Sequence, residues 1–318
     1  MSDLKPKISV IGCGNVGMRY VYALTIKGLA RQIVLVDIDR KRLEGEAQDL
    51  SHGSPYIHPV EIIPGDYPDI KDSDLVVITA GKKQKPGQTR LELAKDNVGL
   101  FKKIIPQVVR NAASAILLIV TNPVDVLSYA AYRFSSKPSR EVIGSGTVLD
   151  TARFRFLLSK HCGVDARNIH AYILGEHGDS EFAVWSRAMI GGILFKDYCC
   201  VCKNNAACEG KQTLHNIFLE VRGSAYRIIE RKGETSYGIG LALARISQAI
   251  IQNENAILPV SSLIKDYLEI NNVYLSLPAV VNREGVREVF KIELDPQEQE
   301  LLKASAGVVK RIIQETGL

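Results

Sequence analysis

Short apolar runs alternate with longer amphipathic stretches through the first half of the chain. Apolar runs bounded by turn residues indicate strands, and apolar positions at helical spacing indicate helices. The runs expected to form strands are 8–11, 33–36, 75–79, 115–120 and 142–143. Because strands that alternate with helices pair in parallel, this half of the chain predicts a parallel sheet with helices on its faces.

The second half has a different pattern, because longer helical stretches dominate it. Hydrophobic positions recur at helical spacing over 147–161, 212–232 and 239–252, and strand-like runs follow at 273–277 and 286–292. A chain of 318 residues exceeds what one hydrophobic core usually supports. We therefore expect two domains that meet near residue 145.

A glycine motif, Gly12-Cys-Gly14-Asn-Val-Gly17, joins the first apolar run to a helical pattern, and the next apolar run ends in Asp37. In this context the glycines allow a tight turn close to a pyrophosphate, the helix N-terminus favours its charge, and the acid can bind ribose hydroxyls. The motif therefore predicts a dinucleotide site. The Asp37 carboxylate would repel an added phosphate, which favours NAD, whereas the basic run 40–42 argues the other way and is interpreted as a solvated helix face.

The expected fold class is α/β. A Rossmann domain with a doubly wound parallel sheet should span 1–144, and a mixed α+β catalytic domain should span 145–318. Ligands of such sheets bind at the carboxyl ends of the strands. Ala80-Gly81 lies at one such end, where the backbone can approach a ligand closely, and Thr121-Asn122-Pro123 lies at another, where a turn exposes an amide.

The candidate for acid–base chemistry is His177, in the segment Gly175-Glu-His-Gly-Asp179. The segment follows the strand-like run 171–174, and its two glycines favour a loop that presents the imidazole. Asp150 and Arg153 lie three residues apart in a helical pattern, so they share one face of a helix. That helix could supply both a partner for the histidine and a clamp for a substrate carboxylate, although a lone histidine can also be purely structural.

The polar segment 81–90 is rich in Lys, Gly and Pro and precedes a helix expected to begin near Leu91. This composition is typical of a mobile lid, and it is also typical of an ordinary surface loop. As a lid, the segment would bring Arg90 into the site on closure.

Composition narrows the class of protein further. Hydrophobic residues make up 46% of the chain, and 40 Lys and Arg against 35 Asp and Glu leave a mild positive balance. Because no basic tract is interleaved with aromatic residues, nucleic acid is not an expected partner. The densest apolar run, 115–120, is too short to span a bilayer, and the first strand-like run begins too early for a secretory signal to precede it. We expect a cytoplasmic protein without a membrane partner.

The six cysteines fit a reducing compartment. Four of them crowd a short insertion-like segment: Cys199, Cys200, Cys202 and Cys208. Their spacing lacks the paired C-x-x-C knuckles of zinc sites. Reduced thiols are therefore expected, and a metal ion is not.

Several motifs occur in a fixed order along almost the whole chain. They are the glycine motif, Thr121-Asn-Pro-Val-Asp, Gly144-Ser-Gly-Thr-Val-Leu-Asp-Thr-Ala-Arg, Gly175-Glu-His-Gly-Asp, Gly233-Glu-Thr-Ser-Tyr-Gly-Ile and Val273-Tyr-Leu-Ser-Leu-Pro-Ala-Val. Together they resemble the lactate and malate dehydrogenase family. The combination is far more specific than any one motif.

The resemblance implies a hydride transfer between NAD and a 2-hydroxy acid. His177 would donate a proton to the ketone oxygen of the 2-oxo acid and act as the base in reverse. Asp150 would orient the imidazole and favour its charged form. Arg153 would hold the substrate carboxylate bidentately, and Arg90 would polarise the carbonyl after lid closure.

The same resemblance assigns further contacts. Asn122 and Ser145 would position substrate and nicotinamide, and Thr235 and Ile239 would line the pocket. The residues expected to bind the cofactor are Gly12, Gly14, Asn15, Val16, Gly17, Asp37, Ala80, Gly81, Asn122, Ser145 and Ile239.

Substrate choice depends mainly on the lid residue Gln84. In this family the equivalent position carries arginine when the substrate has a second carboxylate, as in oxaloacetate, and glutamine when it ends in a methyl group, as in pyruvate. A buried carboxylate beside a neutral amide would be uncompensated. We therefore expect reversible NADH-dependent reduction of pyruvate to L-lactate. Lys85 could soften the discrimination, so malate and branched-chain L-2-hydroxy acid dehydrogenases remain alternatives, and a catalytically silent dinucleotide-binding protein is the alternative outside the enzymes.

Arg155 suggests regulation. It lies two residues beyond Arg153, so on a helix it points away from the substrate site. In bacterial members of the family, an arginine here and a histidine matching His170 form an anion site between subunits that binds fructose 1,6-bisphosphate. The resemblance therefore implies a homotetramer that this sugar bisphosphate activates.

Overall fold

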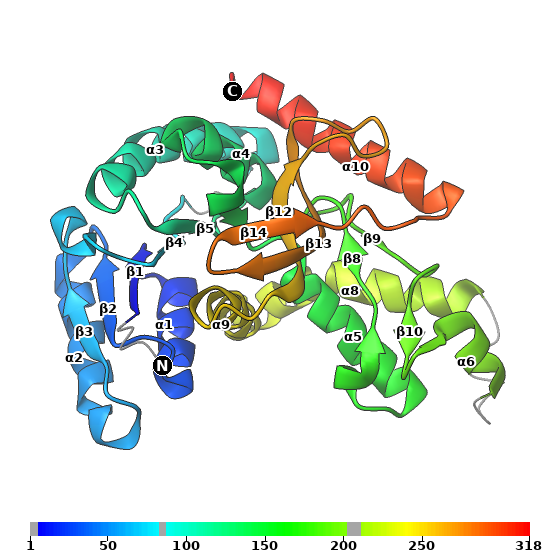
Figure 1. Ribbon diagram of the computed structural model, residues 1–318, viewed down its shortest axis with the longest axis horizontal. Coiled ribbons are helices and arrows are strands. Elements are labelled where there is room, and N and C mark those ends of the chain that lie inside the picture. Colours follow the sequence, from blue (N-terminus) through cyan, green and yellow to red (C-terminus); the bar gives the residue numbers. More distant parts are fainter. Residues whose placement is uncertain (1–5, 83–86, 202–210) are drawn as a thin grey trace.

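A large twisted sheet forms the centre of the computed structural model, which describes residues 6–82, 87–201 and 211–318 (Figure 1). The strand order is β14-β13-β12-β6-β5-β4-β1-β2-β3, and the last six strands of this order are all parallel. The parallel strands are β1 (Lys7–Ile11), β2 (Gln32–Val36), β3 (Glu61–Pro64), β4 (Leu75–Ile78), β5 (Ile116–Ile119) and β6 (Val142–Gly144). The order 3-2-1-4-5-6 confirms the predicted Rossmann sheet.

Helices cover both faces of this sheet. Those of the first half are α1 (Asn15–Lys27), α2 (Arg40–His52), α3 (Arg90–Asn111) and α4 (Val124–Ser135). Successive side chains of a strand point to opposite faces, so Val76 of β4 joins the core beneath α3 and α4, whereas Val77 joins the core beneath α1 and α2. Burial on both faces explains why these strands are continuous apolar runs in the sequence.

Three antiparallel strands from the second half extend the same sheet. They are β12 (Ala256–Ile264), β13 (Val273–Asn282) and β14 (Gly285–Val289), and Ser261 of β12 pairs with Gly144 of β6. The sheet therefore continues past residue 145, where the sequence predicts a domain boundary. Of these strands, the sequence analysis missed β12, which contains two serines and a proline.

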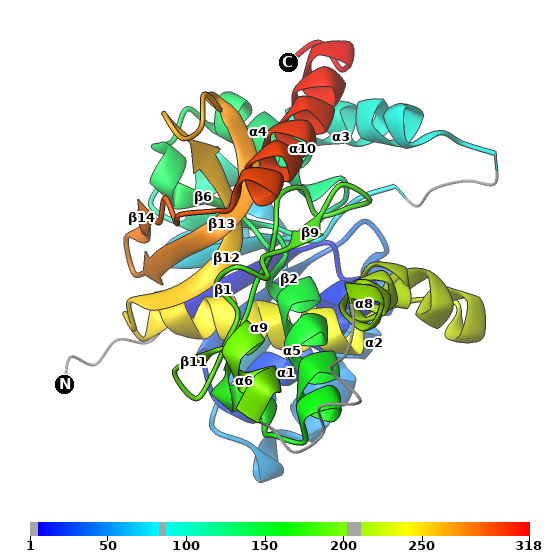
Figure 2. The ribbon, with the colours of Figure 1, turned by 90° about the vertical axis from the view of Figure 1, so that its right-hand side faces the viewer.

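The remaining elements of the second half pack beside the sheet (Figure 2). The helices are α5 (Val148–Cys162), α6 (Phe195–Val201), α8 (Lys211–Lys232), α9 (Tyr237–Ile251) and α10 (Pro296–Glu315). The short strands are β7 (Ile169–His170), β8 (Ile173–Leu174), β9 (Phe182–Ala183), β10 (Met189–Ile190) and β11 (Ile193–Leu194). The predicted helices α5, α8 and α9 and strand β13 are confirmed, and β14 ends earlier than expected. Strand β3 and helix α10 were not predicted.

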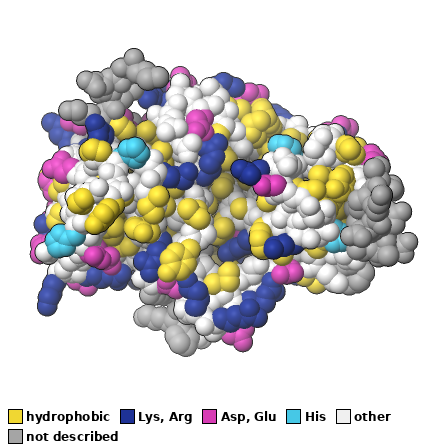
Figure 3. Space-filling model, turned by 90° about the horizontal axis from the view of Figure 1, so that it is seen from below, with side chains coloured by type: hydrophobic (Ala, Val, Ile, Leu, Met, Phe, Trp, Pro, Cys, Tyr) yellow, Lys and Arg dark blue, Asp and Glu magenta, His cyan; other side chains and the backbone are white. Residues whose placement is uncertain are grey.

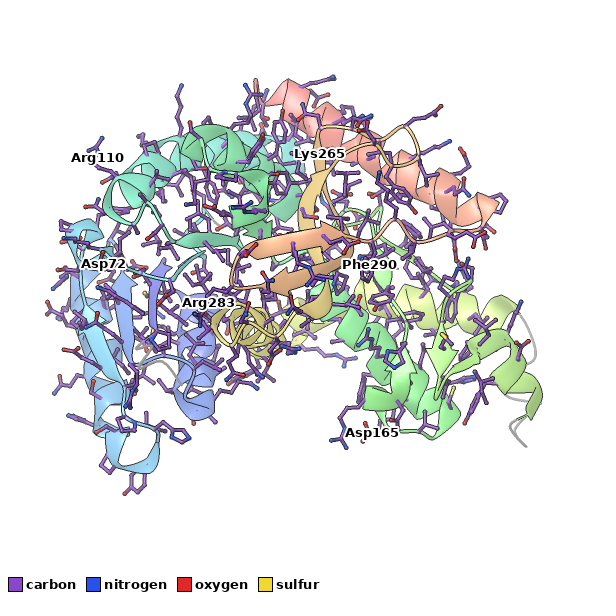
Figure 4. All side chains as sticks on the ribbon, viewed as in Figure 1. Asp72, Arg110, Asp165, Lys265, Arg283 and Phe290 are labelled. Atoms are coloured by element: carbon purple, nitrogen blue, oxygen red, sulfur yellow. The ribbon has the colours of Figure 1, made fainter. Side chains whose placement is uncertain are left out.

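The two halves of the chain are in close contact along α1 and α9. The Tyr20 hydroxyl of α1 lies 2.6 Å from the Ser247 hydroxyl of α9, and both side chains are buried. A Cβ atom added to Gly240 of α9 would lie 2.9 Å from the backbone of Arg19, so only glycine allows this approach. Charged side chains such as Asp72, Arg110 and Asp165 lie at the periphery (Figure 4). Among the described residues, no helix has the length and apolar character needed to cross a membrane.

Candidate active site

The glycine motif forms a tight turn between β1 and α1. Gly12 has φ +97°, and a Cβ atom there would lie 2.3 Å from the Ala80 nitrogen at the end of β4. A Cβ atom on Gly17 would lie 2.3 Å from the Gly12 carbonyl oxygen, whereas one on Gly14 would have no described atom within 4 Å. Gly12 and Gly17 thus close the turn, and Gly14 leaves open space in front of the helix N-terminus.

Asp37, at the end of β2, accepts two backbone hydrogen bonds. Its Oδ2 accepts from the Cys13 N–H at 2.6 Å, and its Oδ1 accepts from the Asp39 N–H at 3.0 Å. The nearby cations have partners of their own, because Arg40 pairs with Glu44 at 2.9 Å and Arg42 pairs with Glu46 at 3.3 Å. Arg40 and Arg42 nevertheless line the same cavity as Asp37, so the interpretation of 40–42 as a solvated helix face stays a prediction.

A cavity of about 1500 Å³ opens along the carboxyl ends of β1, β2 and β4. Of the predicted positions, its lining includes Gly12, Gly14, Asn15, Val16, Gly17, Asp37, Ala80, Gly81 and Thr235. The glycine cradle, the bare helix N-terminus and the acid all face one elongated space, so these residues fit a dinucleotide.

The other predicted ligand contacts lie on neighbouring elements. Asn122 follows β5 with an exposed side chain and a cis bond to Pro123. Ser145 follows β6 and donates its N–H to the Ile119 carbonyl oxygen at 2.8 Å, so it continues the parallel pairing of β6. Ile239 in α9 packs against the core on the α1 side of the sheet.

Three of the four residues predicted to be catalytic lie together, on α5 and in the loop after β8. His177 Nδ1 lies 2.6 Å from Asp150 Oδ2, and the Arg153 guanidinium donates to Asp150 Oδ1 at 2.8 Å. Asp150 is almost fully buried, while 27% of the His177 side-chain surface is exposed. The buried carboxylate therefore engages a cation through each oxygen, and the imidazole keeps an open side.

Charge balance in this group favours the imidazolium. Burial by itself lowers the pKa of His177, but the adjacent Asp150 carboxylate outweighs it and raises the pKa to about 9. The pKa of Asp150 is lowered, because His177 and Arg153 together outweigh the effect of its burial. The site is consequently charged at neutral pH, as a proton donor requires.

Arg90, the first residue of α3, reaches Asp179 in the loop 175–181 between β8 and β9, which we call the catalytic loop. Its guanidinium pairs with Asp179 at 2.8 Å and donates to the Tyr226 hydroxyl of α8 at 2.6 Å. The Tyr226 hydroxyl in turn donates to Asp179 at 3.0 Å. Residues 83–86 lie outside the described part of the chain, so Gln84 and Lys85 have no described position.

Sequence analysis missed Glu181, which precedes β9. Its side chain is 6% exposed, and its carboxylate lies within 4.8 Å of ligand atoms of Asp150 and His177. Burial and the charge of Asp150 raise the pKa of Glu181 to about 9. The three groups lie close enough to hold a metal ion, but the 2.6 Å contact between His177 and Asp150 is that of a hydrogen-bonded pair. A glutamate four residues after the histidine gave no signal in the sequence.

The catalytic loop is anchored through three consecutive N–H groups. The Gly175 N–H donates to the Ser276 carbonyl oxygen of β13 at 3.1 Å, and the Glu176 N–H donates to the Ser305 hydroxyl of α10 at 2.7 Å. The His177 N–H donates to the Asp125 carboxylate of α4 at 2.8 Å. Three separate elements thus fix the backbone that carries the imidazole. None of these anchors was predicted, although Asp125 closes the Thr121-Asn-Pro-Val-Asp motif.

The two residues of the predicted effector site lie on one edge of the second half. The Arg155 Nε donates to the carbonyl oxygen of Ala171, the neighbour of His170, at 3.0 Å. Its guanidinium also lies 5.3 Å from the centre of the Tyr172 ring. Arg155 therefore points away from Asp150, as the helical spacing predicts, and toward β7, where His170 is exposed.

The clustered cysteines are only partly described. Cys199 and Cys200 belong to α6, whose side chains at these two positions are not described, and Cys202 and Cys208 lie outside the described residues.

Two family descriptions match consecutive parts of the chain. Residues 6–144 match the lactate/malate dehydrogenase NAD binding domain, and residues 147–317 match the lactate/malate dehydrogenase alpha/beta C-terminal domain.

Individual relatives are similar over nearly their whole length. The L-lactate dehydrogenase of Thermoanaerobacter sp. (strain X514) is 50% identical over 309 residues, which cover 97% of this chain and 98% of that protein. The L-lactate dehydrogenase of Priestia megaterium is 46% identical, over 96% of this chain and 95% of that protein.

Solved structures agree in fold. MGS-M5, a lactate dehydrogenase from a Medee basin deep-sea metagenome library, superposes with a TM-score of 0.94 at 44% identity and 99% coverage of both chains. The minor L-lactate dehydrogenase from Enterococcus mundtii, in a ligand-bound form, gives 0.93 at 37% identity and 98% coverage of both chains.

Proposed function

This chain belongs to the lactate/malate dehydrogenase family, and we propose that it catalyses the reversible reduction of pyruvate to L-lactate with NADH. The observation that carries the proposal is the contact of 2.6 Å between His177 and the buried Asp150, with Arg153 on the other carboxylate oxygen. The names of the similar proteins, L-lactate dehydrogenases of bacteria, support the choice of substrate.

The proposed cofactor contacts are those of the glycine cradle, Asp37 and Ala80-Gly81, which line the elongated cavity. NADH bound there supplies the hydride that reduces the ketone carbon. Asn122, Ser145 and Ile239 are proposed to contact the nicotinamide end, and Thr235 to line the substrate pocket. The Asp37 carboxylate would repel a phosphate on the ribose, which supports NAD over its phosphorylated form even though Arg40 and Arg42 line the same cavity.

His177 is proposed to move the proton. Its Nδ1 is engaged by Asp150, so Nε2 is the nitrogen that can face substrate. The imidazolium donates the Nε2 proton to the ketone oxygen as the carbon is reduced, and the neutral imidazole takes a proton from the hydroxyl of L-lactate in the reverse direction. Asp150 stabilises the charged form and fixes the ring, as in other histidines that are oriented by a carboxylate.

Two arginines are proposed to bind the anionic substrate. Arg153 uses one nitrogen for Asp150 and can present the rest of its planar guanidinium to the pyruvate carboxylate. Arg90 lies against Asp179, two residues beyond His177, so a short rearrangement would bring it to the carbonyl oxygen. There its charge would stabilise the negative charge that develops on that oxygen.

The proposal is tested by NADH oxidation with pyruvate, oxaloacetate and a branched-chain 2-oxo acid under identical conditions. We expect kcat/KM for pyruvate to exceed that for oxaloacetate by at least about 100-fold, because an uncompensated second carboxylate is costly to bury. It should also exceed that for the branched-chain acid. Replacing Gln84 by arginine should narrow or reverse the preference for pyruvate over oxaloacetate, and Gln88→Arg, also in the lid, is the matched control. A wild-type preference for oxaloacetate or a larger acid would contradict the proposed substrate, and no turnover with any of them would contradict the proposed enzyme.

We also propose that fructose 1,6-bisphosphate activates the protein at Arg155 and His170. The proximity of Arg155 to the backbone beside His170 supports a shared anion site. At low enzyme concentration the sugar bisphosphate should lower the KM for pyruvate, and Arg155→Gln should abolish the effect. Arg167→Gln is the matched control, because Arg167 is an exposed arginine that pairs with Asp165. Unchanged pyruvate affinity on adding the effector would contradict this part.

A homotetramer is the proposed assembly. Large apolar side chains are exposed on two helices that pack together, with Tyr22 and Ile26 on α1 and Tyr237 and Leu241 on α9, each more than half exposed. Figure 3 shows hydrophobic side chains across the underside of the molecule, where these helices lie. Such surface is typical of contact between subunits. Sedimentation velocity should give four times the chain mass of 35.0 kDa, and a monomer at micromolar concentration would contradict the assembly.

The remaining proposals concern organisation and location. Division into an NAD-binding domain over 1–144 and a catalytic domain over 145–318 is supported by the family matches that meet between 144 and 147. A cytoplasmic location fits the buried Cys13, which is a free thiol as expected in a reducing compartment. Fractionation with activity in the membrane or secreted fraction would contradict it.

A further inference from the structure

Asp125 is a buried acid to which the proposed chemistry assigns no role. It lies in the first turn of α4 and is 2% exposed. Its Oδ2 accepts the His177 N–H at 2.8 Å, and its Oδ1 accepts the Ser261 hydroxyl of β12 at 2.5 Å. Burying a carboxylate at this depth is costly unless hydrogen bonds compensate it, so these two hydrogen bonds are needed to hold an ionised Asp125 here.

The two hydrogen bonds place Asp125 between the sheet and the catalytic loop. Ser261 pairs with Gly144, where the parallel and antiparallel parts of the sheet meet. On the other side, Asp125 is three residues from Asn122, which is proposed to contact substrate. The carboxylate, on the helix that follows the Asn122 turn, thus ties the sheet to the backbone of His177.

Among the three anchors of the catalytic loop, Asp125 differs from the other two. Ser276 offers a carbonyl oxygen and Ser305 a hydroxyl, which are neutral groups. The anchor at His177 itself is the carboxylate, and a hydrogen bond to an ionised acceptor is roughly twice as strong as a neutral one. When Asp125 is ionised, the strongest anchor therefore acts on the residue whose side chain must be placed most accurately.

We propose that Asp125 is a positioning residue for this reaction: it fixes the backbone of His177 against the sheet and thereby sets the imidazole between Asp150 and the substrate. The inference rests on the proposed role of His177 as proton donor. The charge of Asp125 also acts on the imidazole through space, together with Asp150 of α5 and Glu181 before β9.

The carboxyl can change its charge without losing this geometry. Burial, and to a smaller degree the charge of Glu176, raise the pKa of Asp125 to about 7, against the hydrogen bonds from Ser261 and His177. When Asp125 is ionised, the Ser261 hydroxyl donates to it. When Asp125 is protonated, the same hydroxyl can accept its proton, because a serine hydroxyl serves in either role. Protonation therefore alters the field at His177 while both contacts remain possible.

Three variants separate anchoring, charge and packing. Asp125→Ala removes both hydrogen bonds, and we expect kcat for pyruvate to fall by about ten- to 100-fold, because misplacement of a catalytic group by about 1 Å has effects of this size. Asp125→Asn keeps an acceptor for the His177 N–H, and kcat should return to within about three-fold of wild type. Ser261→Ala is the control that leaves the His177 contact intact, and its kcat should also stay within about three-fold. The NADH dissociation constant should stay constant in all three, since Asp125 does not line the dinucleotide cavity.

The pH dependence of pyruvate reduction tests whether the negative charge of Asp125 acts on the His177 imidazolium. Loss of the anion lowers the pKa of the imidazolium, so the alkaline limb of pyruvate reduction should move to lower pH in Asp125→Asn by roughly half a unit or more. A purely structural role for Asp125 would lower thermal stability without this shift. An Asp125→Ala variant that folds and keeps wild-type kcat, or an Asp125→Asn limb that coincides with wild type, would overturn the proposal.

A measurement that needs no substrate separates this test from the proposed reaction. The His177 pKa can be followed by NMR titration in wild type and Asp125→Asn, with His177→Asn to assign the signal. If pyruvate is not reduced by wild type but the His177 pKa still falls in Asp125→Asn, the reaction is misassigned and the coupling stands. If pyruvate is reduced and the His177 pKa is unchanged, the coupling is wrong. If Asp125→Ala does not fold, the NMR titration of His177 and the pH profile of pyruvate reduction in Asp125→Asn test the proposal in its place.

Discussion

The glycine loop after β1 and the catalytic loop after β8 are both ligand-facing turns, but they are held in shape by different kinds of contact. The glycine loop is shaped by backbone: Gly12 closes against Ala80, and Gly17 closes against Gly12. In the catalytic loop, the histidine segment is held by side chains 27, 52 and 129 positions away, those of Asp150, Asp125 and Ser305. The sequence motif that specifies the first loop lies within a few residues, although Ala80 and Asp37 contact the loop from other strands. The second loop has no comparable local signal for its contacts, which come from the finished fold.

This difference predicts that mutations in the two loops affect different measured properties. Changes in the glycine loop should affect NADH binding and stability, and changes in the catalytic loop should affect turnover. A catalytic-loop variant that weakens NADH binding, or a glycine-loop variant that lowers kcat while NADH binding and stability stay unchanged, would contradict this separation.

The largest effect is expected for His177→Asn. Removing the proton donor should lower kcat for pyruvate by at least about 100-fold, in the range found for general acids. The NADH dissociation constant, measured by fluorescence titration, should not change, because His177 does not line the dinucleotide cavity. Turnover close to wild type would mean that the proton comes from another group.

Next in size is the pair Gly12→Ala and Gly14→Ala. At Gly12 the added methyl would clash with Ala80 in a backbone conformation that favours glycine, so the melting temperature should fall by roughly 5 °C or more and NADH affinity by at least about ten-fold.

Gly14→Ala serves as the matched control for the fold. Its methyl meets no described atom within 4 Å, and its φ of −72° suits any residue, so the melting temperature should stay near wild type. NADH affinity should still fall, because the second glycine lets the backbone approach the pyrophosphate. Equal losses of stability in both variants would contradict this division of roles.

The smallest effect is expected for Tyr226→Phe, which removes the hydroxyl between Arg90 and Asp179. A lost hydrogen bond of this kind is worth about 1 kcal/mol, which corresponds to roughly a five-fold change in kcat/KM for pyruvate. Tyr56→Phe is the control, because Tyr56 is highly exposed and belongs neither to the site nor to the proposed contact between subunits. An unchanged kcat/KM in Tyr226→Phe would mean that this contact does not position Arg90.

The same difference explains how far the sequence could be interpreted. The parallel sheet, the glycine turn and Asp37 were predictable because strand, turn and helix follow one another within a short segment. Asp150 and Arg153 were predictable as a pair because helical spacing places them on one face. That His177 would lie 2.6 Å from Asp150 required the family resemblance, since no local rule joins a loop to a helix 27 residues earlier.

Other features left no local signal. Strand β12 was missed because serines and a proline interrupt its apolar pattern, although burial on both faces makes it a central strand. Glu181 and Tyr226 lie outside the quoted motifs, and Asp125 closes one of them without any local sign of its role. Tertiary packing brings all three to the site. Their roles depend on desolvation and on partners from distant elements, which periodicity does not encode.

The central claim is that Asp150 keeps His177 protonated so that it can donate to pyruvate. The pH dependence of kcat/KM for pyruvate, measured for wild type and Asp150→Asn, tests it most directly. A pKa raised to about 9 in the folded protein means that reduction persists through neutral pH and is lost as the pH rises through that value. With the neutral amide, the alkaline limb should move down by at least about one unit, toward or below the ordinary histidine pKa of about 6.5. An alkaline limb that stays in place after Asp150→Asn would contradict the account.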